Sequence, residues 1–478
     1  MEALLGGLSL ESDGGRFRLG GEQRRLVGEV LESGFRPLEP ADPVGHLLPE
    51  YGAVVERLGE FVAGAPRGRH VLDHVAATPE TVVRRALLLG ARFWLAGARL
   101  LCVGDHDLTS LAVGMIYPQV ETMVVDVDER ILAYVDQRAA ELGLDVRTRW
   151  ADLRLGLPGS AVEFADLVVT DPPYTPDGVG LFVARGVQGL REQGRGRVLL
   201  AYGASDRTPA LALKVQNALR DLNLVSEAIY PDFNRYYGAE AIGSAADLYV
   251  LRPTSTSLPA ATARADRFSA AIYTQGPQAV EARERSQVSA SDLGEMRPDV
   301  LVGQWPKDVL PEVARARLST WLAKPYAAKV RQAGVALPAG MDAALVRVLL
   351  ATRAERVRVV LDEPVELADI AGILEPVYEL SADGRVVDAV RRPSDRRDDP
   401  VWRILRAVMD RAHGKVANTW RDALLGVDGD LTKRQARALV AEAAPWARDV
   451  SLLELPMHRL RELPDAIREC LARGGAPV

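Results

Sequence analysis

Acidic residues follow several apolar, strand-like runs in the first half of the chain. Gly104 and Asp105 follow the first run, and Asp126 ends the apolar part of the second, 22 residues after Gly104. In nucleotide-binding α/β sheets, an acid at the end of the second strand accepts hydrogen bonds from ribose hydroxyls at about this spacing. The sequence therefore predicts that Asp126 binds a ribose, with Asp128 as the competing candidate. Asp152 follows the third run, and we expect it either to meet an adenine amino group or to lie in an ordinary surface loop.

The segment TDPPYT at 170–175 has residue types suited to proton transfer. Its two prolines stop the preceding strand and fix the backbone, with Asp171 held in an extended conformation. An amine that attacks an electrophilic carbon must lose a proton, so it needs a base within hydrogen-bond reach. We expect Asp171 to be that base, with Pro172 contributing a carbonyl oxygen and Tyr174 closing over the substrate. The alternative is a proline-rich turn with a helix cap at Thr175 or Asp177.

The turn GDHD at 104–107 is acidic where such turns are usually rich in glycine. The carboxylates of Asp105 and Asp107 favour an ammonium ligand over a carboxylate, because a charge pair ~4 Å apart interacts by ~4 kcal/mol at an effective dielectric constant near ~20. Decarboxylated S-adenosylmethionine has the matching charges, with a sulfonium and a propylammonium but no carboxylate. The alternative is that Asp107 caps the following helix. Both hold if Asp107 is the cap and Asp105 is the ligand.

Aromatic residues are dense in the stretch 230–250. Phe233 and Tyr236 are candidates for the walls of a substrate site, and Glu240 is a candidate partner for an additional positive charge. The alternative is that these side chains only pack within a long hairpin connection, which is the more common fate of such residues.

Strand-like runs alternate with amphipathic helical stretches from about residue 76 to residue 253, a pattern that predicts βαβ units and a parallel sheet. The seven runs are 99–104, 121–128, 144–150, 165–174, 196–203, 224–231 and 246–253. Since the last two runs lie close together, we expect the sheet to finish with an antiparallel edge. The sequence thus indicates an α/β fold.

The chain divides into three predicted parts. Residues 1–75 contain two helix candidates, at 21–33 and 49–64, and suggest a small helical or winged-helix module. Residues 76–255 carry the α/β pattern. A polar, proline-containing segment at 252–266 is the best linker candidate, and residues 267–478 read as a mainly helical domain with a short strand-like section and no recognisable chemistry.

Composition limits the classes of function. The net charge of −6 argues mildly against a general nucleic-acid binder, because phosphate contacts need a basic surface. The two cysteines, Cys102 and Cys470, give no metal-ligand spacing and no disulfide framework, so we expect no metal and a reducing cytoplasm. An acidic N-terminus and the lack of a long apolar run predict a soluble protein without a membrane span. A homodimer is expected from base rates alone.

Four motifs together resemble the branched-chain polyamine synthase family, also called bis(aminopropyl)spermidine synthase. They are DHVAATPETVVRRALLL, GDHDLTSLA, TDPPYT and FNRYYGAEAIGS, in this order. The resemblance covers residues 70–252 well and implies a Rossmann-like, class I methyltransferase-type seven-stranded sheet. It also implies transfer of an aminopropyl group from decarboxylated S-adenosylmethionine to a spermidine-like amine, with release of methylthioadenosine.

The resemblance also implies roles for individual residues. Asp171 is similar to the family's catalytic acid, and Pro172 and Tyr174 to its pocket partners. Gly104, Asp105 and Asp107 resemble the family's Gly-Asp-Asp-Asp turn, which lines the donor and amine site.

One position of that turn departs from the family. His106 stands where the family has a third aspartate, which removes one negative charge from the expected substrate site, since an unperturbed histidine is mostly neutral at pH 7. His106 therefore leaves open a donor that keeps its carboxylate, which would give aminocarboxypropyl transfer, and a non-catalytic relative that binds a polyamine or a nucleoside. A third alternative is an S-adenosylmethionine-dependent methyl transferase acting on an amino group, because Asp-Pro-Pro-Tyr also serves nucleic-acid base methylation.

Overall fold

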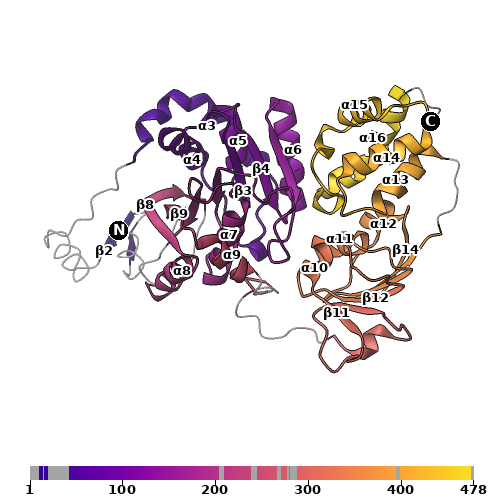
Figure 1. Ribbon diagram of the computed structural model, residues 1–478. Coiled ribbons are helices and arrows are strands. Elements are labelled where there is room, and N and C mark those ends of the chain that lie inside the picture. The colour runs from indigo at the N-terminus through magenta and orange to yellow at the C-terminus, as the bar shows by residue number, and fades with distance from the viewer. Residues whose placement is uncertain are drawn as a thin grey trace.

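The computed structural model describes residues 10–13, 16–19, 42–203, 209–237, 245–265, 271–276, 279, 288–393 and 399–474. Figure 1 shows two lobes side by side, one built around the indigo-to-magenta strands and the other around the orange-to-yellow elements. Near the N-terminus, β1 (Leu10–Asp13) and β2 (Arg16–Leu19) pair as an antiparallel hairpin. Among the described residues, no helix is long and apolar enough to cross a membrane.

A seven-stranded sheet forms the centre of the first lobe. Its strands are β3 (Arg99–Val103), β4 (Glu121–Asp126), β5 (Val146–Trp150), β6 (Leu167–Thr170), β7 (Arg197–Tyr202), β8 (Leu224–Arg235) and β9 (Ala245–Pro253), in the spatial order β5-β4-β3-β6-β7-β9-β8. Strands β3 to β7 are parallel, whereas β9 is antiparallel to both β7 and β8. The predicted α/β fold, its seven strands and its antiparallel end are confirmed.

Helices cover both faces of this sheet, which explains why its central strands are apolar on both sides. They are α3 (Gly52–Gly64), α4 (Pro79–Arg92), α5 (Thr109–Ile116), α6 (Glu129–Leu142), α7 (Pro176–Gly189), α8 (Pro209–Asp221) and α9 (Ser257–Ala265). Within β3, Leu100 and Cys102 join the core under α3 to α6, while Leu101 and Val103 join the core under α7 to α9. The carboxyl ends of the parallel strands thus lie at one edge, where ligands bind in such sheets.

The segment 252–266 is not a linker, and that prediction is wrong for the residues that the structure describes. Strand β9 continues to Pro253, and α9 occupies Ser257–Ala265 and packs against α7. Arg264 of α9 forms an ion pair with Asp177 of α7 at 2.5 Å. The small residues that suggested flexibility include Ala261, whose short side chain is fully buried against the core of the sheet.

The two helices predicted before residue 76 have different outcomes. The candidate at 21–33 lies outside the described residues, whereas the candidate at 49–64 is observed as α3, preceded by a 3-10 helix at Gly45–Tyr51. Helix α3 packs on α4 and α5 across the predicted boundary at residue 75.

The second lobe contains a mixed six-stranded sheet followed by helices. Its strands are β10 (Val300–Gly303), β11 (Ala314–Ala316), β12 (Gln332–Ala336), β13 (Arg356–Val360), β14 (Tyr378–Asp383) and β15 (Val386–Arg391), in the order β11-β10-β12-β13-β15-β14. Its helices are α10 (Leu318–Ala323), α11 (Leu345–Leu350), α12 (Ala368–Leu374), α13 (Pro400–Met409), α14 (Val416–Val427), α15 (Lys433–Ala443) and α16 (Met457–Gly474). Further 3-10 helices lie at His70–Leu72, Ala290–Leu293, Asp342–Ala344, Pro445–Ala447 and Leu452–Glu454.

The predicted helical character is confirmed for residues 400–474, but the sheet is larger than the expected strand-like section. Strands β10 and β12 escaped prediction because they are short and each contains a glycine.

The second lobe docks on α6 and β5 of the first lobe. Arg347, which is 1% exposed, pairs with Glu129 at 2.6 Å and lies 4.2 Å from the ring centre of Trp150. His458 and Arg459, at the start of α16, contact the Asp136 carboxylate of α6 at 2.8 and 2.9 Å. Figure 1 shows α6 facing the helices of the second lobe.

Candidate active site

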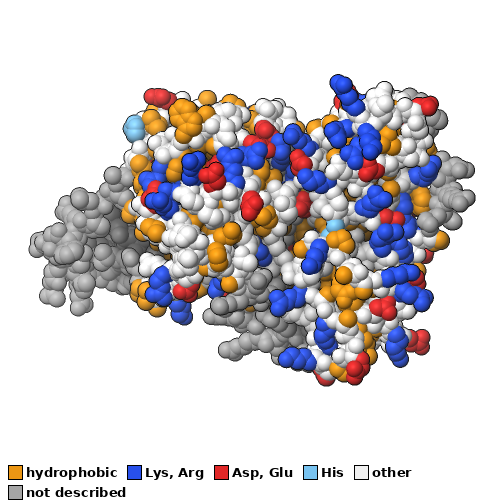
Figure 2. Space-filling view, viewed as in Figure 1, with side chains coloured by type: hydrophobic (Ala, Val, Ile, Leu, Met, Phe, Trp, Pro, Cys, Tyr) orange, Lys and Arg blue, Asp and Glu red, His pale blue; other side chains and the backbone are white. Residues whose placement is uncertain are grey.

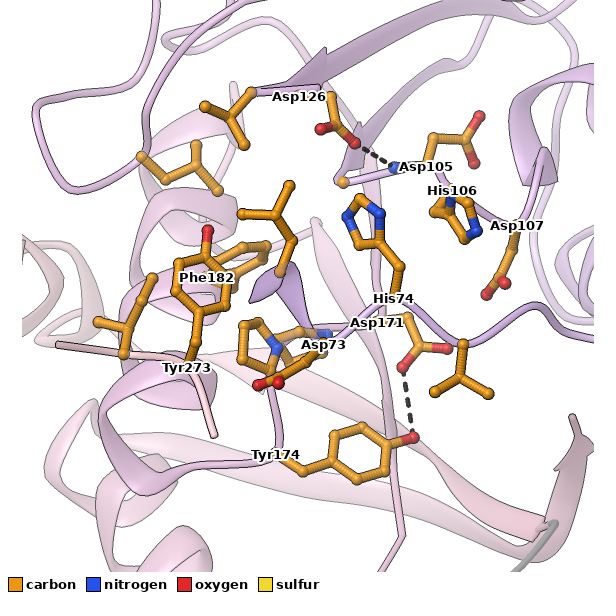
Figure 3. A pocket seen from close by; sticks show the side chains of 18 of the residues that line it. Asp73, His74, Asp105, His106, Asp107, Asp126, Asp171, Tyr174, Phe182 and Tyr273 are labelled. Carbon is orange, nitrogen blue, oxygen red and sulfur yellow. Dashed lines mark hydrogen bonds between the residues drawn. The ribbon is translucent and has the colours of Figure 1, made fainter. Parts of the chain in front are cut away.

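A cavity of about 400 Å³ lies at the carboxyl ends of the parallel strands of the first lobe. Six aspartates line it: Asp73, Asp105, Asp107, Asp126, Asp152 and Asp171. Arg85 is the one described lining residue with a guanidinium or ammonium group. Figure 3 labels Asp73, Asp105, Asp107, Asp126 and Asp171 around one space, with Asp126 and Asp105 on one side and Asp171 and Tyr174 on another. The cavity is therefore rich in acceptors for a cationic ligand.

Arg85 connects the acids of two different loops. Helix α4 begins with the Thr78 cap, which accepts a hydrogen bond from the Thr81 amide, and it carries Arg85 on its buried face. The guanidinium is 2% exposed and donates to Asp107 Oδ2 at 2.7 Å and to Asp171 Oδ2 at 2.8 Å. Its Nε also donates to Asn234 Oδ1 at 2.7 Å. This group fixes the two carboxylates relative to each other.

Sequence reasoning assigned no role to Arg85, although a signal was present. The residue lies three positions after Val82 and four before Leu89, both of which are buried on the same face of α4. A charged residue at a core position of an amphipathic helix indicates a buried carboxylate partner. Asp73, His74, Phe182 and Tyr273 are further lining residues without a predicted role.

Asp171 lies at the cavity with its carboxylate held from two sides. Oδ2 accepts the Arg85 hydrogen bond and a second one from the Tyr236 hydroxyl at 2.6 Å, while Oδ1 accepts one from the Tyr174 hydroxyl at 3.3 Å. The side chain is 20% exposed, so it reaches the cavity. Burial raises the pKa of Asp171 to about 7, against the opposing charge of Arg85. A carboxyl with such a pKa is suited to accept a proton near neutral pH.

The chain around Asp171 is fixed by local structure. Strand β6 ends at Thr170, whose hydroxyl donates to the Val103 carbonyl of the neighbouring strand at 2.8 Å. Pro172 follows and lines the cavity as predicted. Thr175 then caps α7 by accepting a hydrogen bond from the Gly178 amide at 2.9 Å. The cap at Thr175 therefore does not exclude the role of Asp171 as a base, which stays a prediction.

The capping role expected for Asp107 is not observed in the structure. Leu108 is the N-cap of α5, and the carboxylate of Asp105 accepts hydrogen bonds from the backbone and hydroxyl of Ser110 in the first turn. Asp107 accepts hydrogen bonds from Arg85 and from the Ala77 amide at 2.9 Å. Leu108, in a left-handed conformation (φ 63°), takes the N-cap position, so α5 begins at Thr109 and Asp107 does not precede it directly. The prediction of Asp107 as the cap is wrong.

These contacts leave different acceptor capacity at the two acids. Both oxygens of Asp107 are occupied by protein donors, whereas Oδ1 of Asp105 accepts, among the residues that the structure describes, only the Ser110 amide, at 3.3 Å. Burial raises the pKa of Asp105 to about 8. Gly104 precedes them with φ +74°, a conformation that favours glycine, and its amide donates to Val125 at 2.8 Å. Gly104, Asp105 and Asp107 all line the cavity.

Asp126 and Asp152 also line the cavity, at the ends of β4 and β5. Asp126 accepts hydrogen bonds from the Asp105 amide at 3.1 Å and from the Asp128 amide at 2.8 Å, so it joins two strand ends. Asp152 forms a buried bidentate pair with Arg154. Asp128 instead caps α6 and pairs with Arg130. Ribose binding by Asp126 and adenine binding by Asp152 stay predictions.

His106 lines the cavity between the two acids of its turn and is stacked on His74. The ring centres are 4.4 Å apart and the planes differ by 15° (Figure 3). Burial and the neighbouring His106 lower the pKa of His74 to about 3, so His74 is neutral. Nδ1 of His106 is buried with no hydrogen-bond partner in the described part of the chain.

The predictions for the three residues of the aromatic stretch have different outcomes. Tyr236 lines the cavity and contacts Asp171, as described above. Phe233 is not among the residues that line the cavity: it is 1% exposed, and its ring packs under the Arg84 guanidinium at 4.3 Å. Glu240 lies outside the described residues.

One wall of the cavity comes from the chain after α9. Ile272, Tyr273, Thr274 and Gln275 line it. Thr274 is tied to the opposite wall because its amide and hydroxyl donate to Asp73 at 2.7 and 2.6 Å. The cavity is thus closed by a segment that the sequence analysis placed beyond the α/β domain.

Residues 53–254 are similar to a known protein family. They match the family model described as the branched-chain polyamine synthase A C-terminal domain, which confirms the resemblance predicted from the motifs. N(4)-bis(aminopropyl)spermidine synthase of Methanocaldococcus jannaschii is 31% identical over 196 residues, covering 40% of this chain and 55% of that protein. An uncharacterized protein of the same organism is 39% identical over 174 residues, covering 36% of this chain and 43% of that protein.

A crystal structure of the branched-chain polyamine synthase from Thermus thermophilus, in complex with N4-aminopropylspermidine and 5'-methylthioadenosine, is also similar. The TM-score is 0.38 at 25% identity, and the match covers 42% of this chain and 64% of that one. The chain spans about half the length of the curated relatives that it matches, 43% and 55% for the two proteins above.

Proposed function

We propose, from the match of residues 53–254 to the branched-chain polyamine synthase family and from the site geometry, that the first lobe is an aminopropyltransferase. Its donor is decarboxylated S-adenosylmethionine and its acceptor is a spermidine-like amine. The observation that carries the proposal is Asp171, a carboxylate at a cationic-ligand cavity that is oriented by Arg85 and Tyr236 and has a pKa raised to about 7.

The reaction needs a base at the attacking nitrogen. The nitrogen lone pair forms a bond to the propyl carbon attached to sulfur, the carbon–sulfur bond breaks, and its electron pair stays on sulfur in methylthioadenosine. The proton lost by nitrogen passes to Asp171. Oδ1 is the oxygen suited to receive it, because Oδ2 is occupied by Arg85 and Tyr236 while Oδ1 holds only the long bond from Tyr174. Holding the two reactants in line supplies ~7–11 kcal/mol in well-oriented reactions.

The charges of the cavity support a donor without a carboxylate. S-adenosylmethionine would bring its carboxylate to a site lined by six aspartates. The guanidinium of Arg85, the one available among the described lining residues, is buried and already bound to Asp107 and Asp171. A carboxylate there would lose its hydration without gaining a partner, which is unfavourable. The propylammonium of the decarboxylated donor instead meets acceptors such as Asp105 Oδ1.

Replacing Asp171 by asparagine tests the proposal. The substitution keeps the shape of the side chain but removes the base, so we expect kcat to fall by roughly 10²- to 10⁴-fold. Product formation is followed by mass spectrometry and folding by circular dichroism. The control Asp221→Asn alters an aspartate that is 74% exposed on α8 and should leave turnover unchanged. Near-normal turnover of the folded Asp171→Asn protein would refute the role of Asp171.

A further inference from the structure

A second cavity lies between the two lobes, beside β5 and α6. Its lining residues have no role in the proposed reaction. Its volume is about 750 Å³. Residues of α6 and β5 line it from the first lobe, and residues of α14, α15 and the start of α16 line it from the second lobe. Figure 2 shows Lys and Arg side chains on both sides of the notch between the lobes.

The lining of this cavity is predominantly basic. Its cationic residues are Arg147, Arg149, Lys415, Arg421, Arg437, Arg448 and Arg459, and its acidic residues are Asp136, Asp145 and Asp449. Each of the three acids already has a basic partner: Asp136 contacts Arg459, Asp145 contacts Arg147, and Asp449 contacts Lys415. The negative charges of these three acids therefore do not neutralise the positive charges of the other lining cations.

Five of the seven cations pair with a carboxylate, within the cavity or beside it. Arg149 and Arg437 have no carboxylate within ion-pair distance in the part of the chain that the structure describes. Arg437 is exposed on α15. Arg149 on β5 is only 3% exposed, so its lack of an ion-pair partner is the stronger indication of a missing anion.

Arg149 is a buried guanidinium held only by neutral groups. Nε donates to the Ser160 hydroxyl at 3.1 Å and Nη1 to the Thr148 carbonyl at 2.8 Å. The nearby acid Glu454 is engaged by the backbone amides of Ser160 and Ser451. Burial lowers the pKa of Arg149, and the negative charge of Glu454, which forms no ion pair with it, opposes this shift without cancelling it. Burying an unpaired charge is costly, so an anion at this position would be stabilised.

We propose that the cavity between the lobes binds a phosphate-bearing anion of nucleotide size, with Arg149 and Arg437 as ligands. Guanidinium groups present planar, paired donors that match phosphate oxygens. The volume lies within the range of ~300–1,000 Å³ typical of small-molecule sites. Because Arg149 belongs to the first lobe and Arg437 to the second, the anion bridges the lobes. The site is separate from the aminopropyltransferase proposal and does not depend on it.

Isothermal titration calorimetry of the full chain tests this site, with ATP and inorganic pyrophosphate as probes. We expect saturable binding of one ligand per chain. The variants Arg149→Gln and Arg437→Gln should each weaken binding about 10- to 100-fold, since each removes a charge-assisted contact. The control Arg468→Gln, on the exposed side of α16, should bind as the parent protein does.

Three results would overturn the proposal: no saturable binding of either probe, unchanged affinity in the variants, or binding of a single-stranded oligonucleotide that ATP does not displace. Because Arg437 is exposed, we expect Arg437→Gln to fold, so the test remains decisive even if Arg149→Gln does not fold.

Discussion

Replacing Arg85 by methionine separates the charge of the guanidinium from its volume. In the structure this group contacts the carboxylates of Asp107 and Asp171 at 2.7 and 2.8 Å and is 2% exposed. It favours the charged form of Asp171, so its removal raises the pKa of that carboxyl further above its ordinary value. The repulsion between Asp107 and Asp171 then acts without the intervening cation and raises the pKa in the same direction.

The size of this effect follows from the distances. Two unit charges ~4 Å apart interact by ~4 kcal/mol at an effective dielectric constant near ~20, and opposite charges at this range shift a carboxyl pKa by about 1–3 units. The proposed base must be deprotonated to act, so activity is lost as the pH falls through the pKa of Asp171. In Arg85→Met we therefore expect the acidic limb of the kcat/KM profile to move upward by about 1–3 pH units, with activity partly recovered at alkaline pH.

The assay measures aminopropyl transfer across neutral and alkaline pH for three proteins. The control is Arg84→Met, which alters the adjacent arginine, since Arg84 binds Asp42 and the Phe233 carbonyl and does not contact Asp171. Circular dichroism checks that the variants fold. An acidic limb at the same pH in Arg85→Met and the parent protein would refute the electrostatic link between Arg85 and Asp171.

Three further predictions concern the other contacts of the two lobes. Tyr236→Phe removes the 2.6 Å hydrogen bond to charged Asp171, so the acidic limb should move upward by less than in Arg85→Met; an unchanged profile would contradict this. The propylammonium of the donor at Asp105, whose pKa is about 8, favours the charged form of that carboxyl, so binding of decarboxylated S-adenosylmethionine near pH 7 should release protons; calorimetry in buffers of different ionisation enthalpy detects this, and Asp105→Asn should reduce it. Arg347→Met breaks the buried contact with Glu129 between the lobes and should lower the free energy of unfolding by about 3–5 kcal/mol in urea titrations, whereas an unchanged midpoint would show that the pair contributes little.

The sheet of the first lobe was predictable because its strands are buried on both faces and alternate with amphipathic helices. The same regularity located Asp126 and Asp171 at strand ends, since the carboxyl ends of parallel strands share one edge. The lack of a cap at Asp107 was not predictable, because it depends on the left-handed conformation of Leu108, an apolar residue with no such preference.

Other parts of the site depend on contacts between residues far apart in the chain. Arg85 lies 86 positions before Asp171, and no local pattern indicates that the two side chains meet. The contact between Asp73 and Thr274 spans 201 positions and brings a wall from beyond the predicted domain. Phe233 was misplaced because an aromatic residue beside a site is equally suited to packing under a cationic side chain, as it does under Arg84.

The mass of the reaction product tests the central claim most directly. The full chain is incubated with spermidine and, in separate reactions, with decarboxylated S-adenosylmethionine and with S-adenosylmethionine. We predict that the decarboxylated donor yields methylthioadenosine and an amine heavier by one aminopropyl group, and that S-adenosylmethionine yields no product. A mass gain of an aminocarboxypropyl or methyl group from S-adenosylmethionine, or no product from either donor, would contradict the proposed function.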